Sequence, residues 1–269
     1  MARYINSELL REIKRKVEKI RGKNEDCLIC DWIYRLNLSS MDRESFVHSC
    51  KIEFPEERFT EYSKSVNKKD KRRMVRRLQD AYRRSYQKLL YEGVTEELIK
   101  ELAGSIDPLV HPNKVATYRV LGRNPITGQE HFTNVRPQGA SITPPYPDKI
   151  PLEMKRYIQE LFELQRGKTI ESFLNSAAFA HLHLARIHPF EDTNGRTART
   201  LQNLILRSGK LPPAIIHAGE RFDYYQHLDT AISGWKTRTG QQLMEPSDGE
   251  KEFFNYIAGK VNVVLERVL

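Results

Sequence analysis

Residues 188–199 hold the densest group of side chains in this 269-residue chain that could perform chemistry. The segment reads His-Pro-Phe-Glu-Asp-Thr-Asn-Gly-Arg-Thr-Ala-Arg and combines an imidazole, two adjacent carboxylates and two guanidinium groups. The imidazole of His188 can accept a proton from a hydroxyl group, and Asp192 or Glu191 can hold a divalent cation. Together with the two arginines, these groups suit a site that binds a nucleotide polyphosphate and activates a hydroxyl beside it.

The flanking sequence predicts how this segment is positioned. Residues 171–187 are apolar on nearly all sides, which predicts a buried helix that ends just before His188. Residues 195–208 predict a second helix, and the amides and dipole at its N-terminus favour phosphate oxygens. Arg196 and Arg199 lie three residues apart, so both can reach an anion bound on one face of that helix.

The remaining sequence is predicted to be mainly helical. Apolar residues at helical spacing predict helices over residues 7–21, 28–36, 70–92, 150–166 and from about 247 to 267. Residues 115–147 are the exception, because two strand-like runs, 115–121 and 132–135, enclose a turn-rich segment and predict a hairpin. At the next helix, Asp148 is expected to act as the cap, with Pro151 in the first turn.

Composition narrows the classes of protein that fit. No apolar run is long enough to span a bilayer, and the N-terminus lacks the apolar core of a secretion signal. Three cysteines do not suggest a disulfide framework, so a reducing cytoplasm is the expected compartment, with a secreted effector acting in a host cytosol as the alternative.

The net charge of +9 is concentrated in residues 68–84, which carry nine basic and two acidic residues. Such a stretch suits nucleic acid, an acidic partner or a membrane surface. Apolar residues recur within it at helical spacing, so the favoured interpretation is the solvated face of an amphipathic helix. Nucleic acid is therefore not expected as a partner.

Residues 188–199 closely resemble the signature of the Fic family, His-Pro-Phe-x-(Asp/Glu)-Gly-Asn-Gly-Arg-x-x-Arg, at eleven of twelve positions. The resemblance extends over about residues 95–235. It implies an all-α fold, a Fic-like helical bundle with a short β-hairpin flap. The expected organisation is an N-terminal basic helical region, residues 1–92, followed by a Fic domain with C-terminal helices, residues 93–269.

The same resemblance implies a protein adenylyltransferase, which moves AMP from ATP to a Tyr, Ser or Thr hydroxyl of a target protein and releases pyrophosphate. In that family His188 would be the general base, and Asp192 would bind Mg²⁺ or Mn²⁺. Contacts to the nucleotide and its phosphates are implied for Thr193, Asn194, Gly195, Arg196, Arg199, Tyr224 and Tyr225. The flap would add the target chain as a strand at Val135, Arg136, Gly139 and Ile142.

Two alternatives to AMP transfer stay open at this point. One is a Fic-fold enzyme that transfers another nucleotide or phosphate-containing group, or that removes AMP. The other is a catalytically weak Fic domain that acts as a binding module. Thr193 is the one departure from the signature, at a position where the family has Gly. Because a β-branched residue disfavours positive φ, either the backbone does not need it there or the phosphate-binding loop is altered.

Many Fic proteins are restrained by a helix with the pattern (Ser/Thr)-x-x-x-Glu-(Gly/Asn), whose glutamate pairs with the last arginine of the signature. Glu92, followed by Gly93, and Glu266 are the two candidates, and each is an incomplete match. An unrestrained enzyme, a separate inhibitory partner and a homo-oligomer are the alternatives.

Four potential zinc ligands occur near the N-terminus, namely Cys27, Cys30, His48 and Cys50. Their spacing matches no familiar zinc finger, so buried thiols are the favoured interpretation.

Overall fold

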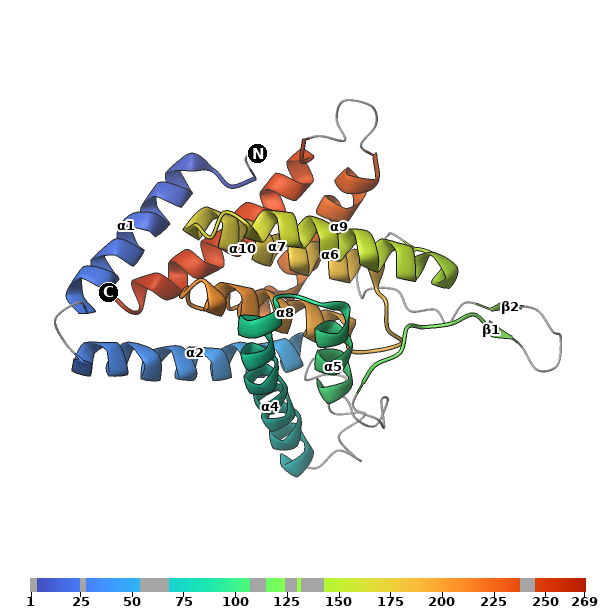
Figure 1. Cartoon of the computed structure of the whole chain (residues 1–269), viewed down its shortest axis with the longest axis horizontal. Coiled ribbons are helices and arrows are strands. Elements are labelled where there is room, and N and C mark those ends of the chain that lie inside the picture. The colour runs from blue at the N-terminus through green and yellow to red at the C-terminus, as the bar shows by residue number, and fades with distance from the viewer. Residues whose placement is uncertain are drawn as a thin grey trace.

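The computed structural model describes residues 4–24, 28–53, 68–106, 115–123, 130–131, 143–237 and 245–269. Its α-helices are α1 (Ser7–Asn24), α2 (Leu28–Glu53), α4 (Lys68–Glu92), α5 (Glu96–Ile106), α6 (Ile150–Gln165), α7 (Ile170–Ile187), α8 (Asn194–Ser208), α9 (Arg221–Thr237) and α10 (Asp248–Glu266). Two short 3₁₀ helices, η1 (Pro147–Lys149) and η2 (Ala218–Glu220), precede α6 and α9. The predicted all-α architecture is confirmed (Figure 1).

Helix α7 lies at the centre of the bundle and packs against α6, α8, α9 and α10 (Figure 1). Its residues from Leu174 to Ile187 are all buried, as its apolar sequence predicts. The helix begins with a capping box, in which the side chains of Thr169 and Ser172 each accept a hydrogen bond from the other's backbone N–H. Burial on all sides and the N-terminal capping box hold α7 in place. His188 follows directly after its last residue.

The N-terminal helices join the same hydrophobic core as the rest of the chain. One cluster of buried apolar residues runs from Ile5 to Leu265. Helix α1 packs along α10, whereas α2 and α4 both pack against α8 (Figure 1). Residues 28–53 and 68–92 therefore lie beside the helix that carries half of the signature.

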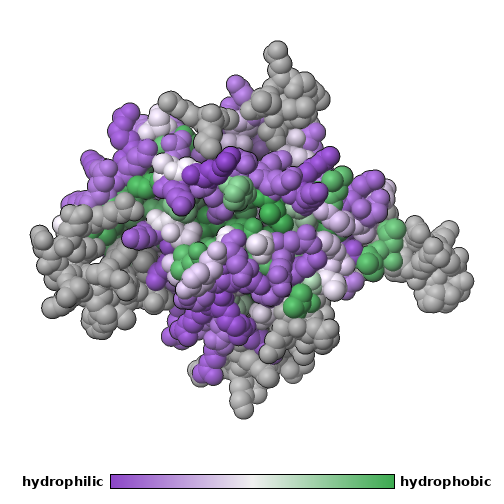
Figure 2. All heavy atoms as spheres, in the orientation of Figure 1, coloured by the Kyte–Doolittle hydropathy of each residue, from purple (hydrophilic) through white to green (hydrophobic). Residues whose placement is uncertain are grey.

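The basic stretch behaves as the amphipathic helix that its spacing predicts. On α4, Leu78 and Tyr82 are buried, whereas Arg76, Arg83 and Arg84 are exposed. Figure 2 shows the corresponding hydrophilic surface at the lower centre of the molecule. The solvated-face interpretation accounts for these positions without a nucleic-acid partner.

The predicted hairpin is not supported in the form expected. Residues 115–121 form no strand, and among the described residues strand pairing is confined to β1 (Gly122–Arg123) and β2 (Glu130–His131), which run antiparallel. Arg119 and its neighbours instead lie against the loop of the signature, so tertiary contacts override the local strand preference. Residues 132–142, which include the four flap residues, lie outside the described part of the chain.

Three other details bear on the sequence expectations. Asp148 does not cap α6; it lies within η1, and the N-cap position is Lys149, with no side-chain cap. Helix α10 begins with a capping box, in which the Ser247 hydroxyl accepts from the N–H of Glu250. Helix α2 extends to Glu53, well beyond the predicted end at residue 36.

A search of the described residues for a helix long and apolar enough to cross a bilayer found none.

Candidate active site

His188 occupies a strained backbone position at the end of α7. It is the C-cap residue, with φ 51° and ψ 57°, and its N–H donates to the carbonyl of Leu184 at 2.9 Å. A residue with a Cβ in this left-handed conformation costs about 1–2 kcal/mol, and the position before a proline is restricted further. The conformation therefore persists only because its surroundings hold it.

The imidazole of His188 is oriented by the helix that precedes it. Its Nδ1 atom lies 3.3 Å from the carbonyl oxygen of Ala185, and the residue is 9% exposed. A carbonyl oxygen only accepts hydrogen bonds, so Nδ1 carries the proton in this contact. The neutral ring then has its lone pair on Nε2, which is the tautomer a general base needs.

The loop between α7 and α8 is closed by the side chain of Asn194. Its Oδ1 accepts the N–H of Phe190 at 2.9 Å, and its Nδ2 donates to the carbonyl of Phe190 at 2.7 Å. Phe190 itself is fully buried. The side-chain amide of Asn194 is thus engaged with the backbone and sets the shape of the loop.

Replacing Asn194 with alanine is expected to lower the free energy of unfolding by about 1–3 kcal/mol. The substitution leaves a buried N–H and a buried carbonyl of Phe190 without their partner. Urea unfolding followed by circular dichroism measures the change. The matched control is Asn262→Ala on the half-buried face of α10, for which a smaller loss is expected. Equal losses in the two variants would contradict the role assigned to Asn194.

The backbone conformation of Thr193 decides between the two alternatives that the sequence left open. It is the N-cap of α8 with φ 71° and ψ −4°, so this position does adopt positive φ although the residue is β-branched. Of these two alternatives, the structure excludes the one in which this position avoids positive φ. Its hydroxyl is buried without a hydrogen-bond partner in the described structure, which leaves an oxygen available to a bound group beside Asp192.

The carboxylate of Asp192 lies at the N-terminus of α8. Its Oδ1 accepts the N–H of Thr193 at 2.6 Å, and its Oδ2 accepts from Nη2 of Arg196 at 3.1 Å. The Asp192 side chain is 53% exposed, whereas that of Arg196 is 3% exposed. The half-exposed carboxylate can bind a cation. The buried guanidinium and the first amides of α8 can bind the phosphate oxygens that the cation shares.

Arg199 is held deeper in the core by groups from two other helices. Its Nε donates to the Ser49 hydroxyl at 2.9 Å, and its Nη2 donates to the Ser49 carbonyl at 3.1 Å. Its Nη1 lies 3.3 Å from the hydroxyl of Tyr224. Sequence reasoning missed Ser49, although Ser49-x-x-x-Glu53 matches the first five positions of the restraining pattern, with Phe54 in place of Gly or Asn.

Tyr224 lies in the core and not on an open surface. It is 1% exposed, and its hydroxyl lies between Arg199 and the ring of His181. Tyr225 is partly buried and packs beside it. The structure therefore gives Tyr224 a role in holding Arg199, and leaves Tyr225 as the member of the pair that is more accessible to a nucleotide base.

Neither glutamate proposed as inhibitory contacts Arg199 in the described part of the chain. Glu266 pairs with Lys16 of α1 at 2.7 Å. Glu92 is exposed near the end of α4, whereas Arg199 is 4% exposed. Contacts to Arg199 come instead from Ser49 of α2 and from Tyr224 of α9.

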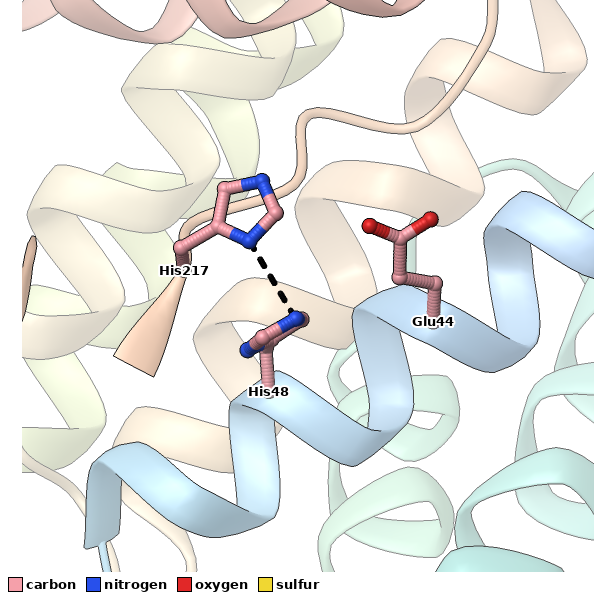
Figure 3. Close-up of side chains that lie close together, drawn as sticks. All are labelled: Glu44, His48 and His217. Carbon is pink, nitrogen blue, oxygen red and sulfur yellow. Dashed lines mark hydrogen bonds between the residues drawn. The ribbon is translucent and has the colours of Figure 1, made fainter. Parts of the chain in front are cut away.

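Of the four potential zinc ligands, only His48 and Cys50 have side chains in the described part of the chain. Cys27 and the side chain of Cys30 lie outside it, and Cys50 is buried. His48 instead faces His217, with Nε2 of His48 and Nδ1 of His217 3.2 Å apart (Figure 3).

Glu44 approaches this histidine pair closely enough for the three side chains to share a cation. However, Arg267 donates to both oxygens of Glu44 at 3.1 and 3.0 Å, and the N–H of Ala218 donates to Nδ1 of His48 at 3.2 Å. Both nitrogens of His48 and the carboxylate of Glu44 therefore already have hydrogen-bond partners. We interpret the cluster as a contact that holds α2 against the segment before η2.

The described fold is a helical bundle in which a buried helix, α7, places His188 beside the N-terminus of α8. Residues 94–206 match the model of the Fic/DOC family. The matched residues contain the whole of residues 188–199.

Curated relatives carry the name protein adenylyltransferase Fic. The Drosophila melanogaster protein is 40% identical over 117 residues, which cover 43% of this chain and 23% of that protein. The Nematostella vectensis protein is 41% identical over 116 residues, 43% of this chain and 27% of that protein. The chain thus aligns with about a quarter of the length of these relatives.

Solved structures share the fold over nearly the whole chain. A Fic domain containing signaling protein from Bacteroides thetaiotaomicron is 20% identical with a TM-score of 0.69, over 96% of both chains. A structure of IbpAFic2 covalently tethered to Cdc42 is 14% identical with a TM-score of 0.53, over 94% of this chain and 70% of the other. These likenesses extend to the N-terminal helices, which the family model does not reach.

Proposed function

We propose that this chain is a protein adenylyltransferase, which transfers AMP from ATP to a hydroxyl group of a target protein. The observation that carries the proposal is the placement of the His188 base beside the N-terminus of α8, where Asp192 and Arg196 lie. The curated relatives that share the family domain bear this activity in their names.

In the proposed reaction, Nε2 of His188 removes the proton of the target hydroxyl as its oxygen attacks the α-phosphorus of ATP. A bond forms between this oxygen and phosphorus, the bond from phosphorus to the pyrophosphate oxygen breaks, and pyrophosphate leaves with the electron pair. The Gly195 amide and Arg196 lie where negative charge grows on the phosphate oxygens. Arg199 is the proposed partner of the γ-phosphate.

The residues at the loop fit a hard divalent cation such as Mg²⁺ or Mn²⁺. Asp192 offers a half-exposed carboxylate, and the unpaired hydroxyl of Thr193 lies beside it. Such an ion, when bound, neutralises charge on the nucleotide phosphates. Asp192 would hold it.

For target docking we propose the segment that contains Val135, Arg136, Gly139 and Ile142, none of which lies among the described residues. The chain on either side of that segment supports the proposal, because Val120 is 65% and Tyr146 is 60% exposed. Exposed apolar side chains at both ends suit an extended partner chain. The IbpAFic2 structure tethered to Cdc42 is a precedent for a protein target in this fold.

The proposal is tested by incubating the purified chain with ATP, CTP, GTP or UTP labelled at the α-phosphate. Label transfer from ATP to the chain itself or to an added protein is the expected result. Transfer from another nucleotide in preference to ATP would favour the alternative of a different transferred group. Tight ATP binding without any transfer would favour a binding module.

We also propose that α2 is the restraining helix, because Ser49 binds the guanidinium of Arg199 and Glu53 follows one turn later. Removing this hold should free Arg199 for the γ-phosphate. Glu53→Gly and Ser49→Ala are each expected to raise ATP-dependent self-modification about tenfold, since a hydrogen bond to a charged group contributes about 1.5–3 kcal/mol.

Glu92→Gly is the matched control for this prediction, and its self-modification rate is expected to equal that of the unsubstituted chain. The rates are measured as label incorporated per minute at saturating ATP. If Glu92→Gly alone accelerates the reaction, the restraint lies on α4 and the assignment to α2 is wrong.

A further inference from the structure

Arg119 is a buried arginine that binds three backbone carbonyl groups around the candidate base. Its Nε donates to the carbonyl of His188 at 2.7 Å, and its Nη2 donates to the carbonyl of Pro145 at 2.5 Å. Its own backbone N–H donates to the carbonyl of Pro189 at 2.9 Å. The residue is 5% exposed. The side chain of Arg119 thus connects the base with the segment that precedes α6, and its backbone N–H binds the loop that follows the base.

These contacts act where the backbone is strained. His188 has positive φ and stands directly before Pro189, so neither its Cβ nor the proline ring favours the observed conformation. Arg119 binds the carbonyls on both sides of that junction. Rotation of the peptide group after His188 breaks the first bond, and rotation of the next peptide group breaks the second, so Arg119 restrains the direction in which the His188 side chain leaves the backbone.

The guanidinium group of Arg119 is suited to binding two carbonyl groups at the same time. Its Nε and Nη2 present two N–H groups in a fixed planar fork, whereas a lysine offers one compact ammonium group. The hydrogen-bond partners of Arg119 among the described residues are carbonyl oxygens and include no carboxylate. Burial lowers the pKa of Arg119, which shows that the cation is retained in the interior at an energetic cost. A solvent-facing arginine would not carry that cost.

The contact with Pro145 extends the restraint toward the proposed docking segment. Residues 143–146 lie immediately after the proposed flap residues, and Lys236 also binds them by donating to the Thr143 carbonyl at 2.7 Å. Arg119 therefore connects the base with the residues that follow the proposed docking segment.

We propose that Arg119 is a positioning residue, which aligns the imidazole of His188 with the hydroxyl of the docked target. The inference rests on the proposed function, since alignment matters only if His188 removes a proton. A displacement of the order of 1 Å at a reacting group can cost about 100-fold in rate. Arg119 touches no residue proposed to hold the nucleotide, so its effect should fall on the transfer step and not on ATP binding.

The test compares Arg119→Lys, which keeps the charge but loses the fork, with Arg166→Lys at an exposed position on the other side of α6. For Arg119→Lys the expected result is a kcat for AMP transfer lowered about 10–100-fold, with the KM for ATP within about twofold. Arg166→Lys is expected to match the unsubstituted chain. An unchanged kcat, or a KM that rises in proportion to the loss of kcat, would overturn the proposal.

A second measurement does not depend on activity. Nitrogen-15 NMR of the imidazole rings reports which ring nitrogen carries the proton, and the His188 signals among the eight histidines are assigned by their loss in His188→Ala. One fixed Nδ1–H tautomer is expected in the unsubstituted chain, and exchange between tautomers in Arg119→Lys. If the chain transfers no AMP, the proposed function fails while this spectrum still decides the role of Arg119. An identical His188 spectrum in the two proteins would refute it.

Discussion

Replacing His188 with alanine is expected to lower the rate of AMP transfer by a factor of about 10²–10⁴, the usual contribution of a positioned general base. The Nδ1 contact with Ala185 leaves Nε2 as the basic nitrogen, and Arg119 fixes the backbone from which the ring projects. No other imidazole in the described structure lies on the loop between α7 and α8. The loss should therefore appear in kcat, with ATP affinity retained.

The His188→Ala substitution removes the proposed base with little expected change in stability. Alanine also has a Cβ, so the backbone cost of positive φ at residue 188 stays in place and Tm should change little. His227→Ala on α9 serves as the matched control, because that ring packs on Tyr256 away from the loop, and its transfer rate should be unaffected. Undiminished label transfer by His188→Ala, in protein that binds ATP normally, would eliminate His188 as the base.

The site could be predicted from sequence largely because its geometry is local. The base, the loop and the N-terminus of α8 lie within twelve consecutive residues, and the turn is closed by Asn194 four residues after Phe190. Helical periodicity on both sides was strong enough to place α7 and α8 within a residue or two of their observed ends. Local signals of this kind do not depend on which distant elements pack nearby.

The contacts to Arg199 could not be predicted in this way. Ser49 is 150 residues from Arg199 in sequence, and Ser45, which accepts from Asn203, is 158 residues from its partner. Small polar residues around Asn37 and Ser40 resemble a helix end, and packing of α2 against α4 and α8 explains why the helix continues to residue 53. Polar contacts between distant helices leave no periodic signal in the sequence.

A buried polar network extends from Arg199 into the core and makes His181 its central group. Nδ1 of His181 lies 2.6 Å from Oε1 of Gln202, and its Nε2 lies 2.8 Å from the hydroxyl of Tyr224. The amide oxygen of Gln202 accepts, so Nδ1 is protonated and Nε2 accepts from Tyr224. The hydroxyl oxygen of Tyr224 then accepts from Nη1 of Arg199. The position of that arginine therefore depends on His181 being neutral.

Burial lowers the pKa of His181 to about 3, with the charge of Arg199 acting in the same direction and the hydrogen bond to Gln202 opposing both. In the unfolded chain the imidazole titrates near its ordinary value of about 6.5, so between these values the unfolded state binds a proton that the folded state does not. The contribution of His181 to stability is therefore complete above about pH 6.5. It is lost as the pH falls toward 3, at about 1.4 kcal/mol per pH unit.

Asp42 has the opposite sign and must be separated from His181. Burial raises the pKa of Asp42 to about 6, although Arg207 and the Tyr82 hydroxyl both act to lower it. The folded state then holds a proton on Asp42 over a range where the unfolded state does not, and stability rises as the pH falls through that range. In the unsubstituted chain the two effects offset each other in part, so a single stability curve would hide both.

The free energy of unfolding of the unsubstituted chain and of His181→Gln should therefore be measured by urea titration from pH 7 to pH 4.5. Because Asp42 and His181 share no hydrogen-bond partner, the contribution of Asp42 cancels in the difference between the two proteins. That difference is expected to shift by about 2–3 kcal/mol over this interval, against the unsubstituted chain at the acid end. Parallel curves would mean that His181 is charged or exposed in the folded protein, and the neutral link from the core to Arg199 would then be wrong.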